Sequence, residues 1–402
     1  MARAATTTMH RLRFVPAIAL LVVYPAADAQ HRSVATFVTT LGRDTVAIET
    51  WERRTFRLNG EFVLRVPTAV RFKYAIDLRA DGSLSRSRTE LIPLRGDRTH
   101  WVVVTERQGD STRVTFDSAG ARRVVTRATS ALLVPSLTTG FESSFGIYSS
   151  IAMLQLALDR MPPTASDTVA MPTIGVLSGR ATARKLVRRS STEVDVDYFG
   201  IAWTHVTMDA QGLIERVDAT NTTEKTLAFR TTGIDISRVA REYASRDAAG
   251  RGIGVASPLD SAAATIGGTN VFIRYSSPRR RGRHILGETV PYDSVWRTGA
   301  NAATVLHLER DLFVGDALVR RGTYSVWTRP TRGGVTLILN RQHGQWGTEY
   351  DSTRDVAHIA MFVTPATTEQ EQFNIALVAE RDTGTLRVSW DDFVWSVPLR
   401  AR

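Results

Sequence analysis

Cysteine is absent from this chain of 402 residues, so neither a disulfide nor a thiolate metal site can form. Stability must therefore come from packing alone, which requires hydrophobic cores of ordinary size. At roughly 150 residues per domain, a chain of this length favours two domains.

Long apolar runs are also scarce. The Phe14–Tyr24 stretch is apolar throughout, follows three arginines and precedes small residues that end at Ala29. This pattern predicts a signal peptide over residues 1–29, cleaved after Ala29, and a periplasmic or secreted protein. No cysteine follows the stretch to carry a lipid anchor. No later run approaches the roughly 20 apolar residues that cross a bilayer, so we expect no transmembrane segment.

Lysine is rare. Lys73, Lys185 and Lys225 are the only lysines, and 48 of the 51 basic residues are arginine, with a net charge of +11. The arginines are spread along the chain, as codon bias in a GC-rich genome would spread them. The run Arg279–Arg281 with Arg283 could meet phosphate, but an exported protein seldom meets nucleic acid. We therefore predict no nucleic-acid partner, and favour peripheral association with an anionic envelope.

Motifs that carry chemistry are missing as well. The histidines are dispersed without ligand spacing, so we predict no metal and no cofactor. Ser325 lies in a predicted strand and lacks a nucleophile elbow. Glu349, Asp351 and Asp355 are the best candidates for an acid and base pair, but we favour the interpretation that they form a solvated loop.

The chain does contain segments in which apolar and polar residues alternate. From Val70 to Leu78 every second residue is apolar, which predicts an antiparallel strand with one buried face. Similar strands, with one helix at about 146–161, predict a sheet or half-barrel domain over residues 30–232. This order of elements resembles the half-barrel of bacterial periplasmic lipoprotein carriers. The sheet could enclose a lipid cavity, or the helix could fill its core; we favour the filled core.

The second half predicts a separate unit. A short helix from Asp235 to Asp247 and a glycine-rich linker occupy residues 233–257. About eight strands follow over residues 258–402, which predicts a jelly-roll-like β-sandwich. The last two strands are expected to form a hairpin with Asp391 and Asp392 at its solvated turn. The fold class is therefore mainly β, with two antiparallel domains.

Several strings in this second half carry a family resemblance. They are YSSPRRRGRHILG from Tyr275, VPYDSVWRTGANAAT from Val290, GTYS from Gly322, QWG from Gln345 and SWDDFVWSVPL from Ser389. Residues from about 258 to 402 thereby resemble the uncharacterised bacterial family called domain of unknown function 2911. The resemblance implies an exported β-rich module and brings no substrate. Residues before this region resemble no family that we identify.

Aromatic, arginine and asparagine side chains are dense within these strings. Arginine offers planar hydrogen bonding, asparagine both donates and accepts, and tryptophan or tyrosine offers a stacking face. Such a set suits a sugar, a carboxylate or a small polar ligand, but it equally suits a network that supports a long loop. The predicted ligand-binding residues are Arg283, Tyr292, Trp296, Arg297, Asn301, Tyr324 and Trp346.

These features favour non-catalytic binding of a glycan-like ligand of the envelope or the extracellular space by the C-terminal sandwich. Two other classes stay open. One is a hydrolase that acts on an extracellular polymer through loop carboxylates, and the other is a structural or assembly module of the envelope. Side-chain burial around Trp296 distinguishes the three classes. A shallow aromatic shelf favours binding, a deep cleft with two facing carboxylates favours the hydrolase, and full burial of Arg297 and Asn301 favours structure.

Overall fold

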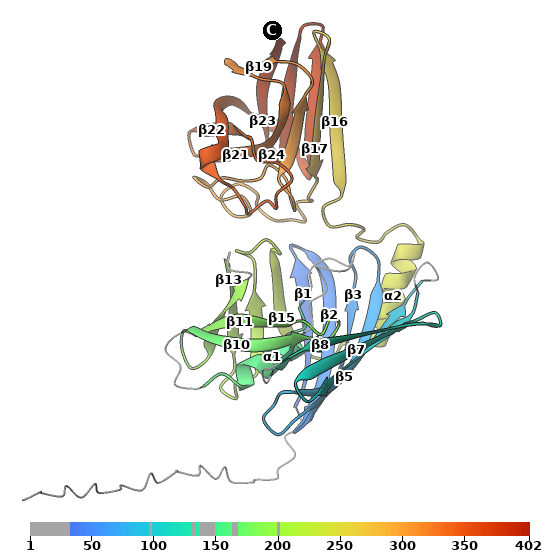
Figure 1. Ribbon diagram of the computed structural model, residues 1–402. Coiled ribbons are helices and arrows are strands. Elements are labelled where there is room, and N and C mark those ends of the chain that lie inside the picture. The colour runs from blue at the N-terminus through green and yellow to red at the C-terminus, as the bar shows by residue number, and fades with distance from the viewer. Residues whose placement is uncertain (1–32, 96–98, 130–132, 137–148, 163–167, 199–201) are drawn as a thin grey trace, which may run out of the picture.

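The computed structural model describes residues 33–95, 99–129, 133–136, 149–162, 168–198 and 202–402. The predicted signal peptide, residues 1–29, lies outside the described residues. Two sheets form two lobes, one following the other along the chain (Figure 1). The predicted fold class, mainly antiparallel β with a helix packed on the first sheet, is confirmed.

The first sheet has 15 strands in the order β8-β7-β6-β5-β4-β3-β2-β1-β15-β14-β13-β12-β11-β10-β9. Most neighbours in space are neighbours in sequence, and the pairing of β1 with β15 joins the two halves. The strands are β1 (Ser33–Leu41), β2 (Asp44–Arg54), β3 (Arg57–Leu64), β4 (Val70–Leu78), β5 (Leu84–Pro93), β6 (Trp101–Gln108), β7 (Ser111–Ser118), β8 (Ala121–Ala128), β9 (Val134–Ser136), β10 (Thr168–Gly175), β11 (Ala181–Arg188), β12 (Glu193–Tyr198), β13 (Ala202–Met208), β14 (Ile214–Asp218) and β15 (Thr226–Thr231).

Strand β4 shows why this region folds as a sheet. Its alternating apolar side chains are buried, from Val70 through Phe72 and Tyr74 to Leu78, while Lys73 is exposed. Phe72 stacks on Phe62 of the neighbouring β3 with ring centroids 4.5 Å apart. Burial of one face therefore fixes the register, because a slip by one residue would expose every aromatic ring.

Two helices cover opposite faces of the first sheet. Helix α1 (Ile151–Asp159) lies within the curve of the sheet, and its apolar side chains join the main core (Figure 1). The start of the predicted helix at about 146 falls outside the described residues. Helix α2 (Ile236–Ala248) is capped by Asp235, whose carboxylate accepts from the amides of Ser237 and Arg238. It packs against Ile48 and Val63 on the other face.

Glu49 of β2 joins α1 to the sheet. Its side chain is fully buried, and its Oε1 accepts from Tyr74 Oη at 2.8 Å and from Ser150 Oγ at 2.6 Å. Its Oε2 accepts from the amide of Ile151 at 2.7 Å. A carboxylate at a helix N-terminus satisfies amides that have no partner within the helix and interacts favourably with the helix dipole. This contact fixes the position of α1 in the core.

The second sheet has nine strands in the order β16-β17-β18-β21-β22-β23-β24-β19-β20. The long β23 pairs with β22 and β24, and register shifts between Pro365 and Asn374 let it serve both halves of the sandwich. The elements are β16 (Leu259–Ile266), β17 (Thr269–Ser276), β18 (Thr304–Leu308), β19 (Leu312–Val314), β20 (Ala317–Val319), β21 (Gly322–Thr331), β22 (Gly334–Asn340), the 3-10 helix η1 (Ser352–Arg354), β23 (Asp355–Glu380) and β24 (Thr383–Ala401).

The predicted turn at Asp391 is wrong. Strand β24 runs through it, and the hairpin turn lies instead between Glu380 and Thr383. Buried positions change from even to odd numbers here, and a bulge at Asp391, with φ of 51°, absorbs the extra residue. The carboxylate is buried rather than solvated. It lies 3.1 Å from a guanidinium nitrogen of Arg280 and accepts from the amide of Ile285.

Replacing Glu49 with alanine should lower the free energy of unfolding by roughly 3 kcal/mol, because several buried donors lose their acceptor together. Thermal or urea unfolding of the full chain measures the change. The control is Glu52→Ala on the same strand, where a part-exposed ion pair with Arg54 should contribute no more than about 1 kcal/mol. Equal losses in the two variants would contradict the anchoring role of Glu49.

Candidate functional site

The predicted ligand-binding residues separate into three groups, of which the first lies in the core. Trp296 packs between Trp390, stacked at 6.0 Å between centroids, and Phe373, edge-on at 5.4 Å. Tyr324 is buried, and its hydroxyl donates to the carbonyl of Arg320 at 2.8 Å. Tyr324 is buried and Trp296 is partly buried, and both pack against the hydrophobic core of the sandwich.

A second group forms one surface at an end of the sandwich. Arg297 Nη1 donates to the carbonyl of Gly347 at 3.3 Å, and the amide of Gly347 donates to the carbonyl of Asn301. Gly347 has no room for a Cβ, which would meet the Arg297 side chain. The neighbouring Trp346 is 41% exposed, and Asn301 is exposed as well. Arg297, Asn301 and Trp346 therefore form a continuous surface with a free indole face.

The third group is divided. Tyr292 is half-buried, and the guanidinium of Arg332 lies 5.3 Å from its ring centroid. Arg283 lies in the loop between β17 and β18, where it donates to the carbonyls of Arg279 and Arg280. Burial, and secondarily the charge of Arg281, lower the pKa of Arg283 to about 10.

The loop that carries Arg283 touches the first sheet. The amide of Arg43, in the turn between β1 and β2, donates to the carbonyl of Arg281 at 2.8 Å. Arg281 is buried and forms an ion pair with Asp44, while its Nε and Nη2 have no hydrogen-bond partner among the described residues. The sandwich therefore meets the first sheet through a buried guanidinium that is only partly satisfied.

Lys225 joins this junction from the turn between β14 and β15. Its pKa is lowered by burial first, and then by the charges of Arg283 and Arg297. Lys73 and Lys185 are exposed. Sequence analysis did not predict this position of Lys225, because Lys225 lies in the other lobe from its two arginine neighbours. We define the junction cluster as Lys225, Arg281, Arg283 and Arg297.

Residues 257–399 match the model of a family described as Protein of unknown function (DUF2911). This confirms the resemblance predicted for the second half of the chain. The region before residue 257 matches no family model, and no curated protein matches the chain. Lys225, which no family model covers, therefore lies near two arginines of the matched region, Arg283 and Arg297.

The loop carboxylates Glu349, Asp351 and Asp355 each accept hydrogen bonds from nearby groups. Asp351 caps η1, and the hydroxyl and amide of Thr353 hold its pKa below the usual range. Asp355 accepts from Asn340 Nδ2 at 2.7 Å and from Tyr350 Oη at 2.6 Å. Glu349 accepts from the amide of Trp346 at 3.1 Å. These carboxylates shape the loop that carries Trp346. Asp351 and Asp355 each accept more than one hydrogen bond.

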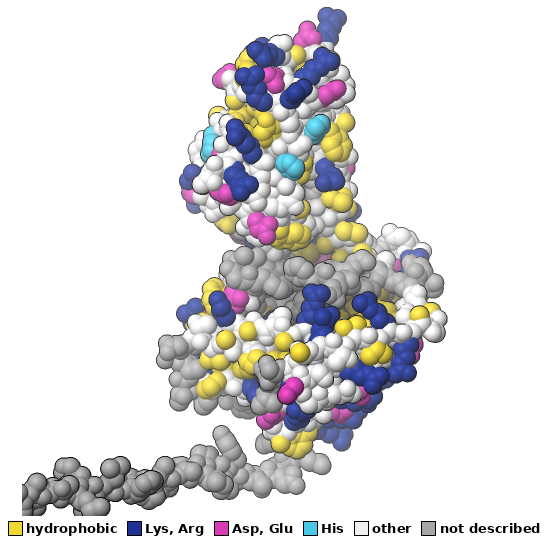
Figure 2. Space-filling view, viewed as in Figure 1, with side chains coloured by type: hydrophobic (Ala, Val, Ile, Leu, Met, Phe, Trp, Pro, Cys, Tyr) yellow, Lys and Arg dark blue, Asp and Glu magenta, His cyan; other side chains and the backbone are white. Residues whose placement is uncertain are grey.

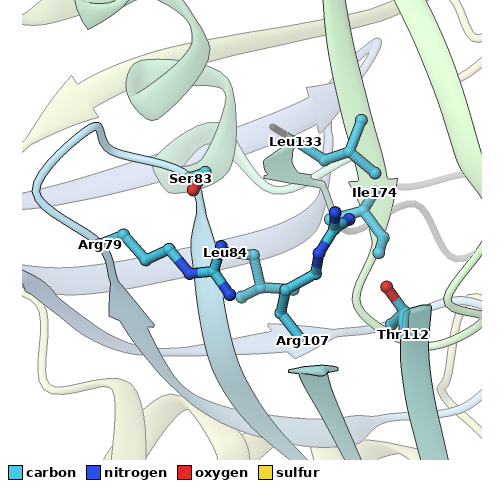
Figure 3. Close-up of a pocket in the computed structure, with 7 residues that line it drawn as sticks. All are labelled: Arg79, Ser83, Leu84, Arg107, Thr112, Leu133 and Ile174. Carbon is cyan, nitrogen blue, oxygen red and sulfur yellow. The ribbon is translucent and has the colours of Figure 1, made fainter. Parts of the chain in front are cut away.

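A small pocket inside the first lobe is lined by polar and apolar side chains. The guanidinium groups of Arg79 and Arg107 approach it, with the hydroxyls of Ser83 and Thr112 at its edge (Figure 3). Its volume of about 10 Å³ admits roughly one water molecule, so it cannot hold an organic ligand. No cluster of three metal-ligating side chains occurs in the part of the chain that the structure describes.

Lysine and arginine side chains are spread over the visible face of both lobes rather than gathered in one stripe (Figure 2). The distribution differs from the continuous basic surface typical of nucleic-acid binding. Among the described residues, neither helix is long and apolar enough to cross a bilayer.

Glu224 adjoins Lys225, and burial raises its pKa to about 7 against the opposing charge of Arg184. Because the folded pKa exceeds the unfolded value of 4.5, this group contributes stability below pH 4.5 that is lost as the pH rises through about 7. We expect Glu224→Gln to unfold at a higher temperature than the wild type at pH 8.5. The advantage, about 2 kcal/mol, should disappear at pH 5.

Thermal unfolding from pH 5 to 8.5 measures this difference. Glu215→Gln, which removes an exposed carboxylate from the adjacent β14, is the matched control and should show no such pH dependence. A constant difference between Glu224→Gln and the wild type across this range would refute the assignment.

Proposed function

We propose that this chain is a non-catalytic binding protein of the cell envelope or extracellular space, and that it recognises an acidic, glycan-like ligand. The binding surface consists of the junction cluster together with Asn301 and Trp346. One observation carries the proposal: cationic side chains from two sheets converge, and their mutual repulsion disfavours the ligand-free state. An anionic ligand would relieve that repulsion.

The cations of the junction cluster differ in whether a carboxylate pairs with them. Arg280 and Arg281 have carboxylate partners in Asp391 and Asp44. Lys225 and Arg283 instead have pKa values lowered by burial and by neighbouring positive charge. Keeping them charged in the folded protein costs free energy, which is a pattern typical of functional sites. Arg281 adds buried Nε and Nη2 groups that have no hydrogen-bond partner among the described residues.

The rim of the same surface suits a sugar. The Trp346 ring is 41% exposed, and an indole face can pack on the apolar face of a pyranose. Within the described part of the chain, Asn301 Nδ2 makes long contacts of 3.4 Å, to the carbonyl of Ser257 and to Ser276 Oγ. Its amide oxygen and nitrogen are therefore suited to exchange these weak contacts for hydroxyl partners. Cationic centre and aromatic rim together favour an acidic sugar over a neutral one.

Lys225→Gln should weaken the binding of oligogalacturonate about tenfold, which corresponds to roughly 1.4 kcal/mol. The same change should leave the melting temperature of the ligand-free protein unchanged or higher at low salt, because it removes like-charge repulsion. Isothermal titration calorimetry and thermal unfolding measure the two effects. Neutral malto-oligosaccharides serve as the ligand control, and Lys73→Gln, at an exposed lysine of β4, serves as the protein control.

The two readouts separate binding from structure. Weaker binding with undiminished melting supports the proposal. A marked fall in melting temperature would assign Lys225 to the scaffold. Equal affinity of the wild type and Lys225→Gln, or no preference for acidic over neutral oligomers, would contradict the proposed site.

Trp346→Ala should also weaken oligogalacturonate binding by roughly tenfold, because stacking on an exposed aromatic ring contributes on the order of 1 kcal/mol. Its melting temperature should change little, since much of the ring is exposed. Trp296→Ala is the contrasting variant: the partly buried Trp296 packs against Trp390, Trp395 and Phe373, so its loss should destabilise the fold by about 3 kcal/mol. Calorimetric titration of Trp346→Ala with unchanged affinity would remove this residue from the binding surface.

A further inference from the structure

A second cavity lies beside the junction but is lined by different residues. It has a volume of about 350 Å³ and opens between α2 and the turn that precedes β2. Helix α2 stands next to β3 at the side of the first lobe, close to the linker that leads to β16 (Figure 1). The volume lies in the range of small-molecule sites and exceeds what a few ordered waters need. Its lining residues are Arg43, Asp44, Thr45, Arg65, Val239, Glu242, Tyr243 and Arg246.

Arg65 is the unusual member of this lining. It is only 9% exposed, and its Nη1 makes one long hydrogen bond of 3.4 Å to the carbonyl of Thr45. Its Cζ lies 4.7 Å from the ring centroid of Tyr243. Its buried Nε has no hydrogen-bond partner among the described residues. A buried guanidinium is stable only when its charge and its donors are satisfied, so this geometry calls for an anion.

The carboxylates that line the cavity are already engaged. Asp44 pairs with Arg281 of the sandwich, and Glu242 pairs with Arg246 one helical turn away. Arg43 Nη2 lies 3.7 Å from Glu371 Oε2, and both side chains are exposed. The lining therefore contains three arginines and two carboxylates. Arg65, the most buried of these arginines, has no carboxylate partner among the described residues. The lining keeps an excess of positive charge and of hydrogen-bond donors.

We propose that this cavity binds a small polar molecule through its carboxylate or phosphate group, with Arg65 as the central donor and Arg246 at the mouth. The planar guanidinium of Arg65 presents donors in the geometry that such oxyanions accept. The ring of Tyr243 holds that plane in place, and its hydroxyl stays protonated because burial raises the pKa of Tyr243. The apolar Val239 contributes the remaining wall.

Inorganic phosphate and glucuronate are the test ligands, because they present the same anionic chemistry from two sources. Each is titrated into the full chain at constant ionic strength, with glucose as the uncharged control, and followed by calorimetry and thermal unfolding. We expect saturable binding of at least one anion and no binding of glucose. Phosphate binding alone would identify a phosphate ligand, and glucuronate binding alone would identify a sugar carboxylate.

Arg65→Met keeps the length and packing of the side chain and removes its charge. We expect at least a tenfold loss of affinity for the anion, with an undiminished melting temperature of the ligand-free protein, because a buried charge has been removed. Arg246→Gln, at a more exposed position, gives a second test if Arg65→Met fails to fold. Arg241→Gln on the exposed side of α2 is the matched control and should bind as the wild type does.

Absence of saturable binding of both anions, or equal binding by the wild type, Arg65→Met and Arg246→Gln, would overturn the proposal. This inference stands apart from the proposed function. Lys225→Gln should lose oligogalacturonate and keep the small anion, whereas Arg65→Met should show the reverse. Failure of one site therefore leaves the other site interpretable.

Discussion

The buried carboxylate of Glu49 is the interaction on which the first lobe depends. A charge in the centre of a hydrophobic core is tolerated only when donors surround it, and here the donors come from a neighbouring strand and from the first turn of α1. The helix cannot shift without leaving that charge unsatisfied. A wide sheet that could open and close around a cavity is thereby held in one curvature, with its core filled by α1.

Strand β2 connects this buried carboxylate to the contact between the lobes and to the cavity of Arg65. Glu49 lies in its middle, and Asp44 at its start pairs with Arg281 of the sandwich. The same end of β2 borders the cavity of Arg65. Side chains of one short segment thus contact the core helix, the second lobe and a cavity. Rigid support of this kind keeps repelling cations close together, because a flexible segment would let them separate.

Local pattern predicted much of the fold. The alternation from Val70 to Leu78 and the Asp235 cap of α2 are local signals, and the structure has both. The turn predicted at Asp391 was wrong because a bulge and a turn both interrupt the alternation of buried and exposed residues. What decides between them is the distant Arg280, which satisfies the buried carboxylate within a continuous strand.

The candidate site was less predictable, for the same reason. Aromatic density indicated the sandwich loops but could not distinguish Trp296, which other aromatic rings cover, from Trp346, which stays exposed. Burial of a side chain depends on partners that are remote in sequence. The approach of Lys225 to Arg283 and Arg297 joins separate lobes, and no periodicity or spacing within either lobe encodes it.

The arginine run at residues 279–283 shows how structure divides charges that a sequence presents as one cluster. Arg280 and Arg281 pair with Asp391 and Asp44, so they hold a bulged strand and a lobe contact in place. Arg283 uses its donors on nearby carbonyls and keeps a charge that its neighbours oppose. Arg280 and Arg281 thus have carboxylate partners that stabilise the fold, whereas burial and the charge of Arg281 lower the pKa of Arg283 against the opposing effect of Glu371. Under the proposed function, an anionic ligand would give Arg283 a partner of negative charge, as Asp391 and Asp44 do for Arg280 and Arg281.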